Sequence, residues 1–320
     1  MTSRPLTVGT RGSALALWQT EWVRDRLRRA GHETERVEIR TTGDIVTDVP
    51  LSRIGSRAIF TRQIDDALLE GRIDLAVHSL KDLPTALPEG ISLAAVAERE
   101  DPSDALVGRS QEPLTWETVP HGGIVGTSSL RRRAQLLHVR ADLRVVDLRG
   151  NVGTRVTKLD ESDDWSAVIL ATAGLVRLGL ANRVSQRLPS EVMLPAPGQG
   201  ALAVTVREGD AIASAAARAV HHAKTAMAVI AERAFLGTLE GGCQVPVAAL
   251  ATVREGALKL HGRVVALGGE RAVEGIEIGP ATNDDAAMAV GVALAERLLD
   301  DGADEILALV RGASPPMTEP

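Results

Sequence analysis

Residues 6–27 read LTVGTRGSALALWQTEWVRDRL and carry the pattern from which the architecture of this chain follows. A short apolar segment runs into a Gly-Thr turn, and apolar residues then recur at roughly helical spacing from Leu15 to Val23. This order predicts a strand, a turn and an amphipathic helix. Residues 122–139, GGIVGTSSLRRRAQLLHV, repeat the plan, so we expect two lobes of similar construction.

Strands and helices continue to alternate along the chain. Residues 71–84, GRIDLAVHSLKDLP, contain an apolar segment that ends in a polar turn before Pro84. Residues 164–180, DWSAVILATAGLVRLGL, contain another strand of the buried type, followed by small residues and a helix. This alternation predicts α/β lobes with mostly parallel sheets. In such sheets ligands bind at the carboxyl ends of the strands. The expected strand ends are Thr10-Arg11, His78 to Asp82, Thr127 to Ser129, Arg149-Gly150 and Ala173-Gly174.

The length of 320 residues favours two or three domains. From about Ala216 the pattern changes to a helix, a Gly-Gly-Cys turn, three short strands for which we expect antiparallel pairing, and a further helix from about Asp284 to Leu299. This predicts a small α+β domain. We expect a first lobe from residues 1–98 and 200–216, a second from 99–199, the small domain from 217–312 and a disordered tail from 313–320.

Composition excludes several classes of protein. The amino terminus has no apolar run of signal-peptide length, and no later segment could span a membrane. The single cysteine cannot form an internal disulfide, which favours the cytoplasm. No Cys/His cluster has the spacing of a zinc site, so no metal is expected. The net charge of −6 argues against a general nucleic-acid binder, and we expect a monomer without an obligate protein partner.

Positive charge is concentrated in one region of this acidic chain. Seven arginines lie between Gly126 and Arg155, against Asp142 and Asp147. A charge run can be merely a solvated helix face. However, Gly-Thr-Ser-Ser before a helix offers hydroxyls and backbone N–H groups to an anion. Arg131 and Arg132 in the first turn oppose the helix dipole, which favours an anionic ligand between them.

Two other features carry chemistry. Lys81 and Asp82 directly follow a buried strand, where they form either an ordinary ion pair or a carboxylate and ammonium that act together. Cys243, in LEGGCQVP at residues 239–246, is either an inert buried side chain or a reactive thiol that the Gly-Gly turn presents. The seven histidines are scattered and match no Cys-His dyad motif.

Seven segments together closely resemble the porphobilinogen deaminase (hydroxymethylbilane synthase) family, in order and spacing, from about residue 6 to residue 250. The segments are TRGSALALWQ, AVHSLKDLP, GTSSLRRRAQL, RGNVGTR, LATAGLVRLGL, LPAPGQGALA and LEGGC. The resemblance implies two lobes like those of periplasmic binding proteins around a cleft, plus a small third domain. It implies a tetrapyrrole-pathway transferase that joins four porphobilinogen molecules, releases four ammonia and frees hydroxymethylbilane with water.

The resemblance also implies roles for individual residues. Cys243 would hold a dipyrromethane cofactor through a thioether, and Asp82 would be the catalytic carboxylate that stabilises the azafulvenium cation. The positions implied to bind the cofactor are Ser79, Lys81, Thr127, Ser128, Arg131, Arg132, Arg149, Gly150 and Arg155. Those implied to serve substrate and growing chain are Arg11, Gln19, Arg149, Gly150, Arg155 and Arg177.

One segment departs from the family pattern. Residues 41–63 cover the family's cleft lid, where a Gly-Lys-Gly-x-Phe-x-Lys-Glu pattern is usual and this chain has Arg57, Ala58, Arg62 and Gln63. We therefore expect the lid motion, and not the chemistry, to differ. Two other functions stay open from the residues alone. A non-catalytic two-lobed anion-binding or sensing protein would need no placed thiol, and an RNA-binding protein would need aromatic residues among the 126–155 arginines.

Overall fold

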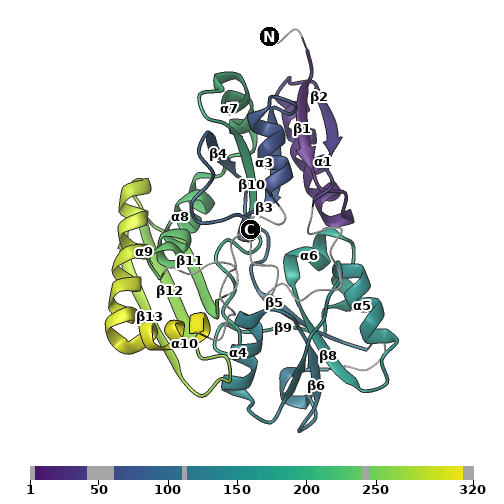
Figure 1. Cartoon of the computed structure of the whole chain (residues 1–320), viewed down its shortest axis with the longest axis vertical. Helices are drawn as coiled ribbons and strands as arrows, with labels where there is room; N and C mark the ends of the chain where they lie inside the picture. Colours follow the sequence, from purple (N-terminus) through teal and green to yellow (C-terminus); the bar gives the residue numbers. More distant parts are fainter. Residues whose placement is uncertain (1–3, 42–60, 110–113, 240–244, 313–320) are drawn as a thin grey trace.

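The computed structural model describes residues 4–41, 61–109, 114–239 and 245–312. Three bodies are visible in Figure 1: a lobe that contains the amino terminus, a second α/β lobe below it, and a third domain beside both. Each body is built on its own sheet. The predicted fold class, two α/β lobes plus a small α+β domain, is confirmed.

Lobe 1 is a five-stranded sheet in the order β2-β1-β3-β10-β4, with helices on both faces. One core cluster joins the sheet to α1 and α7, and another joins it to α3. Its elements are β1 Leu6–Thr10, α1 Ala14–Arg29, β2 Thr34–Glu38, α3 Arg62–Leu69, β3 Leu75–Ser79, β4 Ile91–Val96, β10 Leu202–Arg207 and α7 Ala211–Ala217.

Lobe 2 has the sheet order β7-β6-β8-β5-β9, with α4 on one face and α5 and α6 on the other. Its elements are β5 Asp104–Gly108, β6 Ile124–Gly126, α4 Leu130–Val139, β7 Arg144–Val146, α5 Val152–Asp160, β8 Trp165–Ala171, α6 Thr172–Arg177 and β9 Gln186–Arg187. Short 3-10 turns span Leu80–Asp82, Trp116–Thr118, Ala181–Arg183 and Arg218–Val220, and Val220 of the last one packs in a core cluster of lobe 1.

The two lobes share one topology. In each sheet four strands are parallel, and the fourth strand in spatial order, β10 or β5, runs antiparallel to its neighbours. This strand enters each lobe from the other, because the chain crosses at residues 97–103 and returns at 188–201. The two Gly-Thr motifs lie at the carboxyl ends of β1 and β6, which occupy equivalent places, as the repeated sequence plan predicts. Gly9, Thr10 and Gly126 belong to the strands themselves, so the turn begins later than the sequence pattern predicts.

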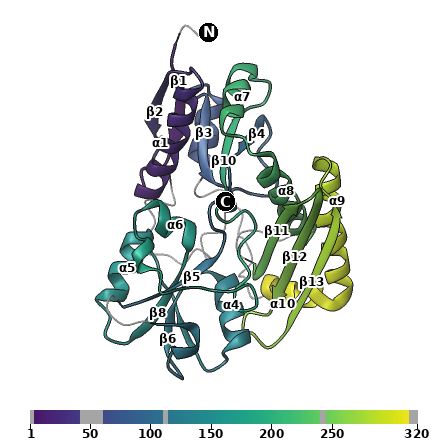
Figure 2. The ribbon, with the colours of Figure 1, turned by 180° about the vertical axis from the view of Figure 1, so that it is seen from behind.

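The third domain packs the antiparallel strands β11, β12 and β13 against α8 and α9 (Figure 2). The sequence predicts these three strands but misses a last helix, α10, because Gly302 adopts φ 98° and kinks the chain within Leu299–Ala303, between α9 and α10. The elements are α8 Ala223–Thr238, β11 Val247–Arg254, β12 Ala257–Val265, β13 Ala272–Pro280, α9 Asp284–Leu298 and α10 Asp304–Gly312.

The domain limits stay a prediction. The strands of each sheet fall within the limits expected for that body, including β10, which the chain places after lobe 2. The limit at residue 216 falls one residue before the end of α7.

The third domain contacts the two lobes in different ways. Against lobe 1, Ala226 and Val229 of α8 join an apolar cluster that includes Leu80 and Leu83. Against lobe 2 it makes polar side-chain contacts.

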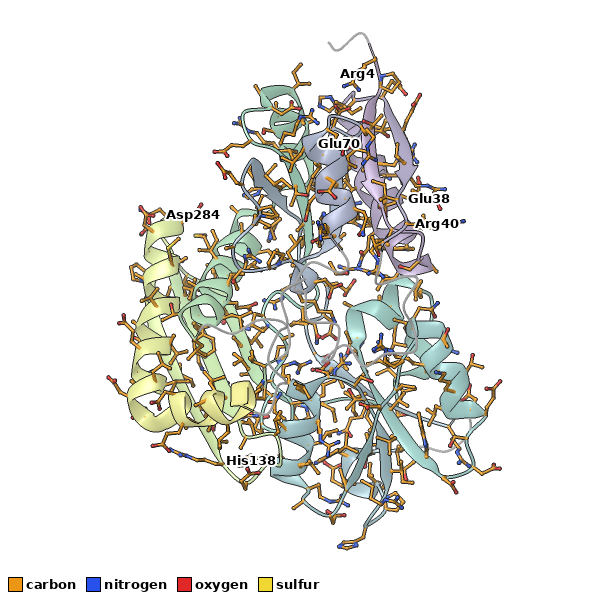
Figure 3. The ribbon with its side chains drawn as sticks, in the orientation of Figure 1. Arg4, Glu38, Arg40, Glu70, His138 and Asp284 are labelled. Carbon is orange, nitrogen blue, oxygen red and sulfur yellow. The ribbon has the colours of Figure 1, made fainter. Side chains whose placement is uncertain are left out.

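In one of these polar contacts, His138 Nδ1 of α4 donates to the Gly269 carbonyl at 2.7 Å, where Figure 3 labels His138 beside the loop between β12 and β13. A Cβ on Gly269 would lie 2.4 Å from the backbone nitrogen of His138, so this approach requires glycine. In the other, Arg263 donates to the Gln135 side chain of α4 at 3.1 Å.

Glu232 of α8 ties the third domain to both crossing segments. Its fully buried carboxylate accepts hydrogen bonds from the Arg99 guanidinium, from the Gly198 N–H at 2.6 Å and from the Ala251 N–H at 2.7 Å. Arg99 lies in the outgoing segment and Gly198 in the returning one. A single carboxylate therefore holds the two crossings and the third sheet together.

We predict that Glu232→Ala lowers the free energy of unfolding by about 3–5 kcal/mol, because it leaves the largely buried Arg99 guanidinium and two backbone N–H groups without this acceptor. Urea denaturation followed by circular dichroism measures this. The matched control is Glu208→Ala at an exposed position, which should stay within about 0.5 kcal/mol of wild type. A Glu232→Ala protein as stable as the control would contradict the assignment.

Candidate active site

The turn after β3 carries the candidate catalytic pair. Leu80 and Leu83 are buried against the third domain, so the 3-10 turn between them holds Lys81 and Asp82 at a fixed place on lobe 1. Just before the turn, Ser79 Oγ accepts a hydrogen bond from Gln19 Nε2 of α1 at 2.9 Å. Gln19 is 2% exposed, so this bond fixes the start of the turn to α1.

The hydroxyls before α4 make local bonds. Ser129 caps the helix and accepts from the Arg132 N–H, Thr127 Oγ1 accepts from the Ser129 N–H, and Ser128 Oγ accepts from the Leu148 N–H at 2.9 Å. These bonds shape the loop between β6 and α4. The hydroxyl groups of the Gly-Thr-Ser-Ser motif therefore have a structural role in this loop.

Arg131 and Arg132 share one buried carboxylate, that of Asp104 at the start of β5. Arg131 Nη1 lies 2.7 Å from Asp104 Oδ2, and Arg132 Nε donates to Oδ1 at 2.9 Å. Burial by itself would raise the pKa of Asp104, but the two guanidinium groups hold that pKa well below its usual range. The two arginines also donate to the carbonyls of Leu194 and Ile169. The anion that the first turn of α4 requires is thus supplied in part by the chain itself.

Lys81 lies among cations. Burial lowers the pKa of Lys81 to about 8, Arg132 acts in the same direction, and Asp82 and Asp104 oppose them. Its ammonium donates to the Gln199 side-chain oxygen at 3.3 Å.

Arg155 of α5 extends the site into lobe 2. Its Nε donates to the Gly150 carbonyl at 2.7 Å. Burial lowers the pKa of Arg155 to about 10, Arg132 and Arg149 add to this, and Asp82 opposes it. The Asp82 carboxylate of lobe 1 therefore lies within electrostatic reach of Arg155 in lobe 2.

Arg177 and Arg11 complete the candidate residues. Arg177 of α6 donates to the Gly200 carbonyl at 2.6 Å and lies 5.8 Å from the Trp18 ring, so it joins lobe 2 to the returning segment and to α1. Burial lowers its pKa to about 10. Arg11 follows β1, and burial together with the Arg11 charge lowers the pKa of His78 to about 4, so this histidine is neutral at physiological pH.

A pocket between the lobes gathers six of the predicted site residues. Its lining contains four cations and no acid among the described residues, which makes it selective for anions. The lining residues are Leu15, Gln19, Ser79, Lys81, Arg132, Val152, Arg155, Leu170, Ala171, Ala173, Gly174, Arg177, Gly200 and Ala201.

The other predicted residues within the described part of the chain are not among those that line this pocket. They are Arg11, Asp82, Thr127, Ser128, Arg131, Arg149 and Gly150. Cys243, the lid positions Arg57 and Ala58 and the tail at 313–320 are outside the described residues. Arg62 and Gln63 form the first turn of α3.

Sequence reasoning missed two residues of the site, Asp104 and Gln199. Asp104 is an acid at the first position of an otherwise apolar strand, which is a usable signal, since such an acid is buried with its strand. Gln199 lies between two glycines in LPAPGQGALA, a segment that resembles the family, but we drew from that resemblance no role for this side chain.

The described part of the chain offers neither a metal-binding cluster nor a membrane-spanning helix. No group of three or more His, Cys, Asp or Glu side chains there could hold a metal ion. None of its helices is long and apolar enough to cross a bilayer.

Comparison with known proteins places this geometry in a family. The model for the porphobilinogen deaminase dipyrromethane cofactor binding domain matches residues 6–215, and the model for the C-terminal domain of the same family matches 226–300. The porphobilinogen deaminase of Desulforudis audaxviator is 51% identical over 97% of this chain and 99% of its own length. That of Geobacter metallireducens is 48% identical over 97% and 96%.

Among solved structures, the methionine binding protein MetQ aligns with 67% of this chain and 89% of its own, at a TM-score of 0.42 and 13% identity, which is too distant to support any conclusion. The two family models cover most of the chain, and the two relatives match it almost from end to end. The chain belongs to the porphobilinogen deaminase family.

Proposed function

We propose that this protein is a hydroxymethylbilane synthase, which joins four porphobilinogen molecules head to tail, releases four ammonia and frees hydroxymethylbilane with water. The observation that carries this is the pocket between the lobes, lined by Lys81, Arg132, Arg155 and Arg177 and by no described acid, in a chain of this family. Each porphobilinogen unit has two carboxylates, so an anionic pyrrole chain matches the charge of the lining.

The donor set also fits a dipyrromethane cofactor, whose two pyrroles carry four carboxylates. When bound, this group supplies the pyrrole end to which the first substrate is joined. Arg132 and Lys81 line the pocket and would bind its carboxylates, and Arg155 would do so from lobe 2. We assign the remaining cofactor contacts to Ser79, Thr127, Ser128, Arg131, Arg149 and Gly150, and the covalent attachment to Cys243.

Asp82 is proposed as the catalytic carboxylate. The departure of ammonia from the substrate leaves positive charge on the pyrrole nitrogen, and a nearby carboxylate stabilises that charge. The fixed turn between Leu80 and Leu83 supports this role, because a preorganised charge needs no rearrangement during the reaction. We assign substrate and growing-chain contacts to Arg11, Gln19, Arg149, Gly150, Arg155 and Arg177.

The setting of the enzyme follows from the attachment chemistry. A thioether at Cys243 requires a free thiol during assembly, which a reducing compartment such as the cytoplasm preserves. We propose a cytoplasmic monomer, and light scattering after size-exclusion chromatography tests its mass.

Intact mass spectrometry tests the proposed cofactor. We expect the purified protein to exceed its sequence mass by two linked pyrrole units, and peptide mapping should locate the excess at Cys243. A protein of unmodified mass that remains inactive when porphobilinogen is supplied would overturn the enzyme assignment. It would favour the alternative, a non-catalytic two-lobed anion-binding protein.

Asp82→Asn should lower turnover by about 10²–10⁴-fold, because the amide cannot neutralise the developing positive charge. Hydroxymethylbilane formation under saturating porphobilinogen measures this. The control is Asp66→Asn, an exposed acid on α3 of the same lobe, which should keep wild-type turnover. If the two variants turn over equally, Asp82 has no catalytic role.

Arg149→Leu should stall chain elongation without unfolding the protein, because a half-buried cation that follows β7 is lost. Mass spectrometry after a short exposure to porphobilinogen should show covalent complexes with one to three added units accumulating. Arg144→Leu, which removes an exposed arginine of β7, is the matched control. An unchanged distribution of complexes in Arg149→Leu would contradict the prediction.

A further inference from the structure

Gln199 stands between the two lobes and is fully buried. It lies in the returning segment, and its own carbonyl accepts from Arg99 Nε at 2.8 Å, so its backbone is tied to the outgoing segment. Its side chain reaches both lobes. The amide oxygen faces Lys81 of lobe 1, and the amide nitrogen faces the entry into β5 of lobe 2.

The neighbours of this amide fix which way it points. Its nitrogen donates to the Pro102 carbonyl at 2.7 Å and to Asp104 Oδ1 at 3.1 Å, with a longer contact to the Ser103 carbonyl. All three are acceptors only, since Asp104 is ionised. The opposite orientation would place the N–H groups against the Lys81 ammonium, which is a donor only. The oxygen must therefore face Lys81.

This orientation matters because of the charge around Lys81. Arg132 disfavours its charged form, as does burial, and Arg131 adds to this. An oxygen held at 3.3 Å by groups of the other lobe favours the charged form. Asp104 thus favours the charged form of Lys81 in two ways: through its own negative charge, and by holding the Gln199 side chain with its oxygen toward Lys81.

We propose that Gln199 is a positioning residue, held by the start of β5, which fixes the Lys81 side chain and stabilises its ammonium form in the pocket. This proposal rests on the proposed function in one respect: the carboxylates that the Lys81 ammonium would bind are those of the pyrrole chain. The titration of Lys81 can be measured without turnover.

The chain has four lysines, at positions 81, 158, 224 and 259, so the protein labelled with ¹³C,¹⁵N-lysine should give four side-chain Nζ signals. Lys81→Arg identifies the signal of Lys81. In the full-length protein, Gln199→Met removes the acceptor and should lower the pKa of Lys81 by about 1. Gln199→Glu places a carboxylate at the same site and should raise it. Intact mass confirms that all samples carry the same modification.

Gln135→Met is the matched control. Gln135 is an equally buried glutamine that holds the returning segment through Leu194, and no described contact joins it to a lysine. It should leave the Lys81 titration unchanged. Activity supplies a second readout, since Gln199→Met should lose proportionally more activity at about pH 9 than at about pH 7, as the ammonium deprotonates earlier.

An unchanged Lys81 titration in Gln199→Met would overturn the proposal, as would an equal change in Gln135→Met. If Gln199→Met does not fold, Gln199→Glu decides, and a Lys81 pKa no higher than in wild type then overturns it. The two proposals can fail separately. If the wild-type protein is inactive but the pKa of Lys81 still falls in Gln199→Met and rises in Gln199→Glu, the proposed function is contradicted and the role of Gln199 is supported.

Discussion

The buried carboxylate of Asp104 is the constraint on which the site depends. It has no solvent exposure, so its ionised form requires partners, and Arg131, Arg132 and Gln199 supply them. Asp104 begins β5, the first strand after the chain crosses from lobe 1. Pairing there fixes the amino end of α4 against the crossing point. Removing one partner of a buried ion pair of this kind lowers the stability of a protein by about 3–5 kcal/mol, so the arrangement is strongly held.

Once Asp104 is paired, the pocket retains a surplus of positive charge. Lys81, Arg155 and Arg177 all have lowered pKa values, mainly because burial disfavours their charged forms. Lowered values mean that the folded chain binds protons less readily than the unfolded chain does. At neutral pH these cations therefore oppose folding, and the opposition fades as the pH rises above the folded-state values. Carboxylates bound in the pocket would favour the charged forms of these groups and so stabilise the folded state. The charge of the pocket therefore suits an anionic ligand.

The third domain supports the site from behind through two unlike interfaces. Its apolar contact with lobe 1 backs the turn that carries Lys81 and Asp82, while its contacts with lobe 2 are the polar ones of His138 and Arg263. Apolar burial is non-directional, whereas the two hydrogen bonds to lobe 2 require a particular position of donor and acceptor. Glu232 links the domain to both crossing segments, so all three bodies meet near the pocket.

Local pattern was enough to predict much of this protein. The alternation of strand and helix, the Gly-Thr motifs at the ends of β1 and β6, and the polar residues at strand ends all follow from neighbours within a few positions. The family resemblance added roles for individual residues, and six of these residues line one pocket. The last helix, α10, was missed because the bend at Gly302 depends on one backbone angle.

The partners of the charged groups required the folded chain. Asp104 is 27 residues from Arg131, and Gln199 is 118 from Lys81. The crossings between the lobes bring these pairs together, and no local spacing records which strand will enter which sheet. The residue types therefore indicated an anion site, while the tertiary structure settled which charges are already neutralised and which remain for a ligand. The physical reason is that burial and pairing, which set the charge state of each group, are properties of contacts between distant segments.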